Sequence, residues 1–377
     1  MSAGVIRVLH IARYRAPSME RKLEVMAAQP GLAFWLVRPA VWQDEYGNVV
    51  VNPMVPGCQV IRVPVLGRTN DPHRAFYRTL TFGMRRIRPH LIHAEEEPDS
   101  LAALQIVLAR RLFAPRAKLV FHTWQNVNRP KKWHVWAVTW ISLQAADAIL
   151  CANSEAVQVL REMGYRGPVG VIPPIGVDTR IFHPMERRTD PATFRVAYAG
   201  RFVPEKGLDI LLEAVARLSP EVELWLIGDG PQRAALQALA QDLGIGERVR
   251  WIPPVVPERM PELLTQVDVV VLPSRTTPVW KEQFGRILVE AMACGVPVVG
   301  SSSGAIPEVV GDAGLVFPEG DPQALANRLG QLKESSNLRQ ELARKGIERT
   351  HALYTPEKIA QQTVQFYQKI LGGFNER

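Results

Sequence analysis

The sequence predicts an α/β protein with two doubly wound, parallel-sheet domains that face a central cleft. Three observations lead to this fold class. The chain has 377 residues, which is too long for one ordinary hydrophobic core and suits two domains. Apolar runs of strand length alternate with segments of helical periodicity almost throughout. A proline-rich, charged segment separates two such series, as is typical of a linker between domains.

The first series of strands lies in the N-terminal half. Its apolar runs are VIRVLHIA (5–12), HLIHA (90–94), KLVFHT (118–123) and DAILCA (147–152). Helical periodicity fills the intervals, for example in SMERKLEVMAA and SEAVQVLREMG. Buried strands that alternate with helices form parallel sheets covered on both faces, so we place the first domain at residues 1–182.

The second series follows the linker-like segment 173–193. Its apolar runs are FRVAYAG (194–200), VELWLIGDG (222–230), VRWIPPV (249–255), VDVVVLPS (267–274) and VPVVGS (296–301). We place the second domain at residues 183–355. Ligands of doubly wound sheets bind at the carboxyl ends of the strands, so the cleft between the two domains is the expected active site.

Cysteine usage and the apolar segments favour a cytoplasmic protein. The three cysteines lie far apart, and neither a disulfide framework nor a zinc signature fits them. The N-terminal MSAGVIRVLHIA has a short apolar run interrupted by Arg7, unlike a signal peptide. The apolar stretch 133–152 contains His134 and Asp147, so it is interpreted as a helix and a buried strand and not as a membrane span.

The net charge of +8 is unevenly distributed. Residues 1–180 hold 23 Lys and Arg against 13 Asp and Glu, whereas the remaining residues hold 22 against 24. The basic N-terminal half therefore favours an anionic partner. Lipid headgroups, nucleic acid or an anionic small molecule would each account for this charge.

The segment KEQFGRILVEAMACGVPVVGSSSG (281–304) sets two carboxylates around a helix start. The helix is expected to begin near Phe284 and Gly285, where the free N–H groups of the first turn attract an anion. Glu282 then lies in the preceding loop, and Glu290 lies further along the helix, where it can accept hydrogen bonds from hydroxyls. This describes a nucleotide-sugar site, although two glutamates at this spacing are common on ordinary helices.

This segment resembles the Glu-x7-Glu donor motif of glycosyltransferase family 4, whose members have the GT-B fold of two Rossmann-like domains. The resemblance extends to AYAGRFVPEKGLDILLEAVARL (197–218), LIGDGPQRAALQALAQDLG (226–244) and DAGLVFPEGDPQALA (312–326). The ordered combination of these motifs is far more specific than any one of them. The resemblance also implies that the last helix, within 356–377, crosses back to the first domain.

The resemblance assigns donor-side roles residue by residue. Arg201 and Lys206 would stabilise the leaving diphosphate, as a positive pair after a strand can; a solvated surface pair is the alternative. Glu282 would bind sugar hydroxyls and Glu290 the ribose. The other expected donor contacts are Gly200, Gly228, Asp229, Gly230, Pro254, Val255, Phe284, Gly285 and Arg286.

The acceptor side is assigned to the N-terminal half. His122 resembles the family's active-centre histidine, which touches the donor sugar; a histidine satisfied at a strand end is the alternative. Glu95 or Glu96 would orient an acceptor hydroxyl, unless these carboxylates only stabilise a helix start. The loop RYRAPSMERK (13–22) lacks the glycines that many family members carry there, so Arg15 or Ser18 would contact the acceptor instead.

The segment NRPKKWHVWAVTW (128–140) places three tryptophans on one helical face, namely Trp133, Trp136 and Trp140. Arg129, Lys131 and Lys132 lie beside them. Tryptophans interleaved with basic residues suggest contact with an anionic membrane surface. A tryptophan stripe that faces the protein core is the alternative.

Together these observations predict a glycosyltransferase that moves a sugar from a nucleotide diphosphate sugar to an acceptor hydroxyl of a glycan, a glycolipid or a small molecule, with retention implied by the resemblance. No metal-ligand spacing is apparent in the sequence, so we expect neither a metal nor another cofactor. A lipid-linked acceptor would suit an enzyme at the inner membrane face, and nucleic acid is not expected as a partner. Two alternatives stay open, a nucleotide-sugar epimerase on the same fold and a polyanion-binding protein.

Overall fold

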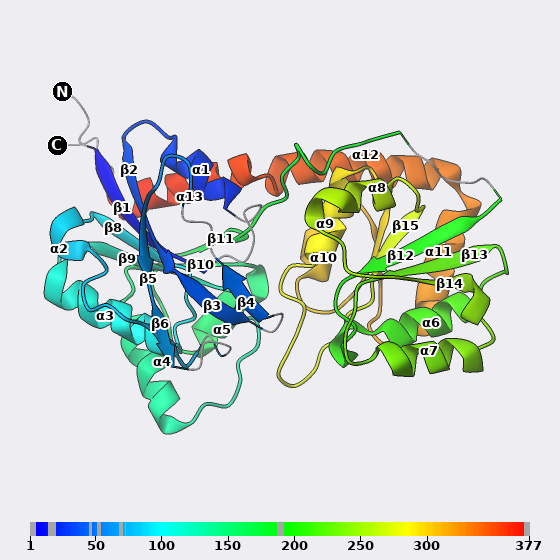
Figure 1. The fold of residues 1–377 in the computed structure, drawn as a ribbon, viewed down its shortest axis with the longest axis horizontal. Coiled ribbons are helices and arrows are strands. Elements are labelled where there is room, and N and C mark those ends of the chain that lie inside the picture. Colours follow the sequence, from blue (N-terminus) through cyan, green and yellow to red (C-terminus); the bar gives the residue numbers. More distant parts are fainter. Residues whose placement is uncertain are drawn as a thin grey trace. The chain divides into compact units, whose positions relative to one another are not determined.

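A computed structural model describes residues 5–13, 20–44, 47–50, 54–67, 71, 73–186 and 192–372. Spatial contacts divide the chain into two compact units (Figure 1). The first unit comprises Met1–Gly176 and Pro356–Arg377, and the second comprises Val177–Thr355. The change of unit after Gly176 comes earlier in the chain than the domain boundary placed after residue 182.

In the described residues of the first unit, seven parallel strands form a sheet in the order β11-β10-β9-β8-β1-β2-β5. Their bounds are β1 (Ile6–Ile11), β2 (Leu32–Pro39), β5 (Gln59–Val63), β8 (Leu91–Ala94), β9 (Lys118–Thr123), β10 (Ala148–Cys151) and β11 (Val169–Val171). Antiparallel ribbons pair β3 (Val41–Asp44) with β4 (Gly47–Val50), and β6 (Val65–Gly67) with β7 (Ala75–Tyr77). The helices are α1 (Arg21–Ala27), α2 (Met84–Ile87), α3 (Leu101–Phe113), α4 (Trp133–Ala145), α5 (Ser154–Glu162) and α13 (Pro356–Ile370).

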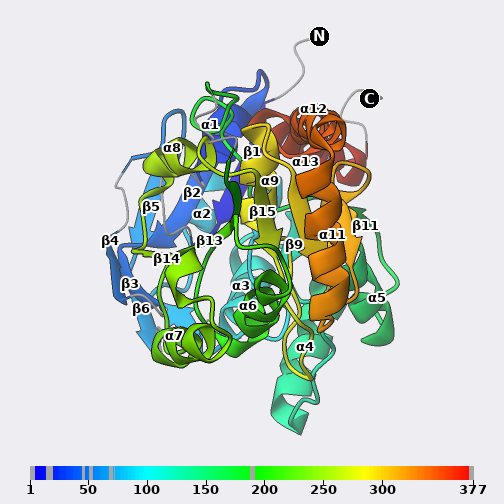
Figure 2. The ribbon, with the colours of Figure 1, turned by 90° about the vertical axis from the view of Figure 1, so that its right-hand side faces the viewer.

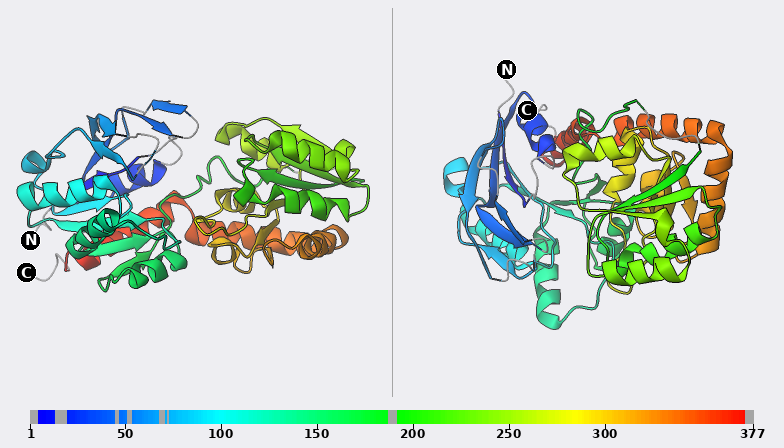
Figure 3. Two further views of the ribbon diagram at one scale, coloured as in Figure 1. Left: turned by 90° about the horizontal axis from the view of Figure 1, so that it is seen from below. Right: turned by 45° about the vertical axis from the view of Figure 1, so that its right-hand side comes forward.

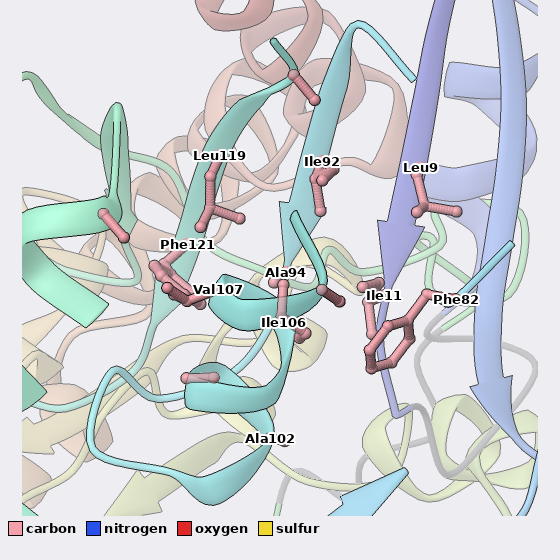
Figure 4. Packing of buried hydrophobic residues seen from close by; sticks show 14 of the residues in the cluster. Leu9, Ile11, Phe82, Ile92, Ala94, Ala102, Ile106, Val107, Leu119 and Phe121 are labelled. Atoms are coloured by element: carbon pink, nitrogen blue, oxygen red, sulfur yellow. The ribbon is translucent and has the colours of Figure 1, made fainter. Parts of the chain in front are cut away.

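The core of the first unit lies between its sheet and α3 (Figure 4). Alternate residues of β1, β8 and β9 pack against the helix, as expected because successive strand side chains point to opposite faces. The strand residues shown are Leu9, Ile11, Ile92, Ala94, Leu119 and Phe121, and the helix contributes Ala102, Ile106 and Val107. The intervening residues of the same strands, including His10, His93 and His122, must therefore face the other side of the sheet.

In the second unit, the described residues form six parallel strands in the order β14-β13-β12-β15-β16-β17. The strand bounds are β12 (Phe194–Ala199), β13 (Val222–Ile227), β14 (Val249–Ile252), β15 (Val269–Leu272), β16 (Val298–Ser301) and β17 (Leu315–Phe317). Helices cover both faces of this sheet (Figures 2 and 3). Their bounds are α6 (Leu208–Ala216), α7 (Arg233–Asp242), α8 (Met260–Leu264), α9 (Arg286–Ala293), α10 (Ile306–Val310), α11 (Pro322–Glu334) and α12 (Ser336–Leu353), with short 3₁₀ turns η2 (Pro204–Lys206), η3 (Gly246–Arg248) and η4 (Pro257–Arg259).

The apolar stretch 133–152 forms α4 followed by β10, which confirms the predicted helix and buried strand. In the ranges that the structure describes, no helix combines the length and the apolar character needed to cross a bilayer. The last helix, α13, belongs to the first unit and packs against α1.

Candidate active site

The strand order of the second unit reverses between β12 and β15. Successive strands from β12 to β14 add on one side, whereas β15 to β17 add on the other. Ligands of doubly wound sheets bind outside the carboxyl ends of the strands at such a reversal. Gly200 and Arg201 follow β12, and Ser274 follows β15, so these residues lie where a ligand is expected.

Lys206 and Glu282 meet at this point. The Lys206 Nζ atom lies 2.6 Å from Glu282 Oε2, and the Ser274 hydroxyl donates to the same oxygen at 2.8 Å. The Trp280 ring centroid lies 4.8 Å from the Lys206 ammonium, within the range of a cation–π contact. A Cβ on Gly207 would lie 2.1 Å from the Pro273 carbonyl oxygen, so only glycine lets the two loops approach this closely.

The helix α9 begins at Arg286, with Gly285 as its N-cap and Phe284 buried just before it. The predicted start near Phe284 and Gly285 is therefore confirmed. On the helix, Arg286 Nε lies 2.7 Å from Glu290 Oε1. Burial raises the pKa of Glu290, and the charge of Arg286 opposes that shift. The carboxylate expected to bind hydroxyls is thus held by an arginine of the preceding turn.

The turn after β13 packs directly on the segment after β12. A Cβ on Gly228 would lie 2.0 Å from the Gly200 carbonyl oxygen, and Gly228 has a φ of +137°. The Phe202 N–H donates to the Asp229 carbonyl at 2.8 Å, and the Asp229 side chain accepts from the Gly230 N–H. The structure therefore brings Gly200, Gly228 and their neighbours together.

Pro254 and Val255 follow β14, the edge strand beside β13, and Pro254 is exposed. An aromatic pair that was not predicted as part of the site is formed by Phe202 and Trp251, whose ring centroids are 6.0 Å apart. The Arg233 guanidinium lies 5.8 Å from the Trp251 ring and 5.9 Å from the Phe202 ring. Trp251 lies within VRWIPPV (249–255) and Arg233 within LIGDGPQRAALQALAQDLG (226–244), and these positions are the signal that could have found them.

Glu95, predicted to orient an acceptor, is part of a buried charge network. Its carboxylate pairs with the Lys22 ammonium and lies 3.2 Å from His10 Nε2. The Lys22 ammonium also donates to the Pro174 carbonyl. Although burial opposes ionisation, Lys22 and His10 hold the pKa of Glu95 well below its usual range. These partners favour a structural role for Glu95, and a contact with an acceptor stays a prediction.

Glu96 is likewise buried and paired. Arg13 donates to it from Nε at 3.0 Å and from Nη2 at 3.1 Å, and the Tyr77 hydroxyl donates at 3.0 Å. Neither glutamate adjoins a helix start, since α3 begins later, at Leu101, with Ser100 as its N-cap. The other acceptor candidates, Arg15 and Ser18, lie outside the described residues.

His122 is 1% exposed, which favours the alternative of a histidine satisfied at a strand end, and its contact with a donor sugar stays a prediction. It lies inside β9, on the face of the sheet opposite Phe121. Its Nε2 lies 2.8 Å from the Ile172 carbonyl oxygen, and its ring stacks on His93. Burial lowers the pKa of His122 to about 3, so the ring is neutral at physiological pH.

One group of potential metal ligands occurs among the described residues, although the sequence predicted none. His10, His93 and Glu95 each offer one potential ligand atom, and these three atoms lie within 4.8 Å of one another. Lys22 already supplies a positive charge to Glu95, and a cation bound there would be repelled by its ammonium. We therefore interpret the group as a charge network that joins β1, β8 and α1.

The three tryptophans of α4 face outward, so the core-facing alternative is wrong. Trp133, Trp136 and Trp140 are 81%, 59% and 52% exposed. Lys132 is exposed beside them, whereas Lys131 is only partly exposed and its ammonium lies 3.3 Å from Asp99 Oδ2. The described structure thus offers an aromatic surface whose adjoining basic residues include Lys132 but not Lys131.

Two family models match the chain, one in each half. The model described as Glycosyltransferase Family 4 matches residues 31–180, and the model described as Glycosyl transferases group 1 matches residues 183–349. The lipopolysaccharide core biosynthesis glycosyltransferase LpsE of Rhizobium meliloti is 30% identical over 277 residues, which cover 72% of this chain and 76% of that protein.

Another relative is the MMP alpha-(1->4)-mannosyltransferase of Mycolicibacterium hassiacum, 33% identical over 61% of this chain and 56% of its own length. A D-inositol 3-phosphate glycosyltransferase of Mycobacteroides abscessus is 37% identical over 42% of this chain and 37% of its own length. The chain thus spans about half or less of these two relatives.

Solved structures with the same fold cover nearly the whole chain. Sucrose-phosphate synthase from Thermosynechococcus elongatus has a TM-score of 0.72 at 23% identity, covering 97% of this chain and 99% of that one. Anabaena HepE in complex with UDP has a TM-score of 0.71 at 18% identity, covering 97% and 100%. At these identities the likeness concerns the fold alone.

Proposed function

Because this chain belongs to glycosyltransferase family 4 and has the GT-B fold, we propose that it is a retaining hexosyltransferase. It transfers a sugar from a nucleotide diphosphate sugar to an acceptor hydroxyl. The observation that carries this proposal is the meeting of Lys206, Glu282 and Ser274 at the strand-order reversal. HepE, whose solved structures hold UDP and UDP-glucose, supports a nucleotide-sugar donor.

The charges around this point suit a leaving diphosphate. Lys206 and Arg201 stand on the turn after β12, and the first N–H groups of α9 add the positive end of a helix dipole. Such preorganised positive groups stabilise charge that develops in the transition state. We propose that they neutralise the diphosphate without a metal ion, and that Glu282 and Glu290 bind hydroxyls of the donor sugar and ribose.

The acceptor is proposed to be a lipid-linked or glycolipid hydroxyl at an anionic membrane. The exposed tryptophans of α4 and the basic N-terminal half support this location. The LpsE relative, named for lipopolysaccharide core biosynthesis, also supports a lipid-borne acceptor.

A thermal-shift screen against UDP-, GDP-, ADP- and dTDP-sugars tests the donor, because a ligand that binds only the folded state raises the unfolding temperature. We expect one nucleotide to stabilise the protein, and turnover of its sugar to require an added hydroxyl acceptor and to persist in EDTA. Conversion of the donor into its epimer without an acceptor would support the epimerase alternative and contradict the transferase.

A further inference from the structure

A groove of about 550 Å³ lies between β7 and α3 in the first unit. Its apolar lining comes from Phe76, Leu80, Leu101, Leu104 and Leu108, and Arg78 also lines it. The leucines of α3 are spaced three or four residues apart, which places them on one face of the helix. The volume is in the range of small-molecule sites.

These apolar side chains are unusually open to solvent. Leu80 is 77% exposed and Leu108 is 49% exposed, and Phe76 and Leu101 are also exposed. Single exposed leucines are ordinary, but several that line one groove indicate a surface that is covered by a partner or ligand.

Two polar groups that line the groove, the Gln105 amide and the Tyr77 hydroxyl, are already hydrogen-bonded within the protein. Gln105 donates to the carbonyls of Tyr77 and Thr79, both at 2.6 Å, and accepts from the Tyr77 N–H at 2.9 Å. The Tyr77 hydroxyl donates to Glu96. A peptide or a sugar would lose its own hydrogen bonds to water on entering such a groove, whereas a hydrocarbon chain has none to lose.

Arg78 lines the groove, and the exposed charge of the stretch that contains the groove, residues 73–146, is positive. Within residues 73–146, the acidic side chains are Glu95, Glu96, Glu97 and Asp99, and none of these residues is exposed. The exposed basic residues of the same stretch are Arg74, Arg78, Arg85, Arg86, Arg88, Arg111, Arg116, Arg129 and Lys132. An apolar ligand that carries a negative headgroup is therefore complementary to this surface.

We propose that the groove binds the hydrocarbon chain of a lipid acceptor, with its phosphate against Arg78. This inference rests on the proposed function in one respect, that the acceptor is lipid-linked. The chain supplies binding energy away from the reacting hydroxyl, and each methylene that enters the groove strengthens binding about fourfold. The enzyme would thereby select acceptors by chain length as well as by sugar.

The test uses alkyl phosphates below their micelle concentrations, measured by calorimetry on the full chain. We expect decyl phosphate to bind at least tenfold more tightly than hexyl phosphate, and inorganic phosphate not to bind detectably. Leu108→Glu and Leu80→Glu should each weaken decyl phosphate binding tenfold or more. Leu112→Glu is the matched control, because Leu112 is 73% exposed on the same helix but does not line the groove.

Equal affinity for the two chain lengths, or equal weakening by Leu112→Glu and Leu108→Glu, would overturn the proposal. Leu108→Glu is expected to keep its binding to anionic vesicles that contain no acceptor, because that binding is assigned to the tryptophans of α4. Loss of this binding would also overturn the proposal, because it would assign the groove to ordinary bilayer lipids. Thermal shifts with nucleotide sugars are measured on the same variants. A protein that responds to a nucleotide sugar but not to decyl phosphate retains the proposed function and loses only the groove assignment.

Discussion

Lys206 Nζ lies 2.6 Å from Glu282 Oε2, although the two residues are 76 positions apart in the chain. The contact joins the turn after β12 to the loop that precedes α9. Both side chains are mostly buried, and Ser274 and Trp280 hold the pair from two further sides. A cation and a carboxylate fixed in this way would need little reorganisation on binding of the proposed charged donor, which is the condition for efficient electrostatic stabilisation.

The two glutamates of the second unit are expected to act at different steps. Glu290→Gln should weaken binding of the free nucleotide, because a ribose hydroxyl would lose a charged acceptor. Glu282→Gln should leave nucleotide affinity near that of the unchanged protein and chiefly lower kcat. Calorimetry with the nucleotide and steady-state kinetics with its sugar measure the two effects. Kinetics like those of the unchanged protein in both variants would contradict these roles.

The positive residues after β12 are expected to stabilise the leaving diphosphate. Lys206→Ala and Arg201→Ala should each lower kcat by roughly 10²-fold, the scale of losing one preorganised electrostatic contact. Kinetics at saturating donor, without added metal, measure the loss. Arg217→Ala is a suitable control, since Arg217 follows α6 and donates to the Glu213 carbonyl. Full activity in both alanine variants would rule the mechanism out.

The two halves of the chain differ in how far the sequence predicts their sites. In the second unit, the motif residues adjoin the carboxyl ends of buried parallel strands, and the fold brings these strand ends together. In the first unit, Glu95 and Glu96 are paired with Lys22 and Arg13, which lie 73 and 83 positions away. Local pattern does not reveal that a carboxylate will be buried against so distant a cation.

The orientation of α4 is a second feature that the sequence pattern does not predict. Apolar residues surround α4 on nearly all sides, so periodicity cannot say which face the core covers. The structure buries Ser142, Leu143 and Thr139 and exposes the tryptophans. Small and branched side chains fit against the neighbouring elements, whereas the large rings remain outside.

Three buried histidines are expected to make the protein acid-sensitive. Burial is the largest cause that lowers the pKa values of His10, His93 and His122. The unfolded chain binds a proton near pH 6.5, whereas folded His122 does not until about pH 3. Its stabilising contribution is therefore complete above pH 6.5 and falls as the pH drops from 6.5 toward 3. The loss is about 1.4 kcal/mol per pH unit for one proton.

His122→Gln removes one of these titrations while its amide can still donate to the Ile172 carbonyl. The free energy of unfolding, measured with urea between pH 4.5 and 7, should then decline less steeply with acid than in the unchanged protein. His134→Gln, at an exposed position of α4, is the matched control variant. The same slope for His122→Gln as for the control would show that His122 does not remain neutral in the folded state.

The tryptophan surface is expected to hold the first unit on anionic vesicles. Trp136→Glu should reduce co-sedimentation with them strongly, because it replaces an aromatic side chain suited to the interface with a charge that the lipid repels. Lys132→Glu should weaken binding by reversing one exposed charge, at roughly 1 kcal/mol per basic residue removed. Lys131→Glu is not a suitable variant, because loss of the pairing between Lys131 and Asp99 would change the structure.

Binding should be absent with neutral vesicles and lost in roughly half-molar salt, where the Debye length is only a few ångströms. A protein that stays in the supernatant with anionic vesicles at low salt would leave the three tryptophans for a protein partner or a soluble acceptor.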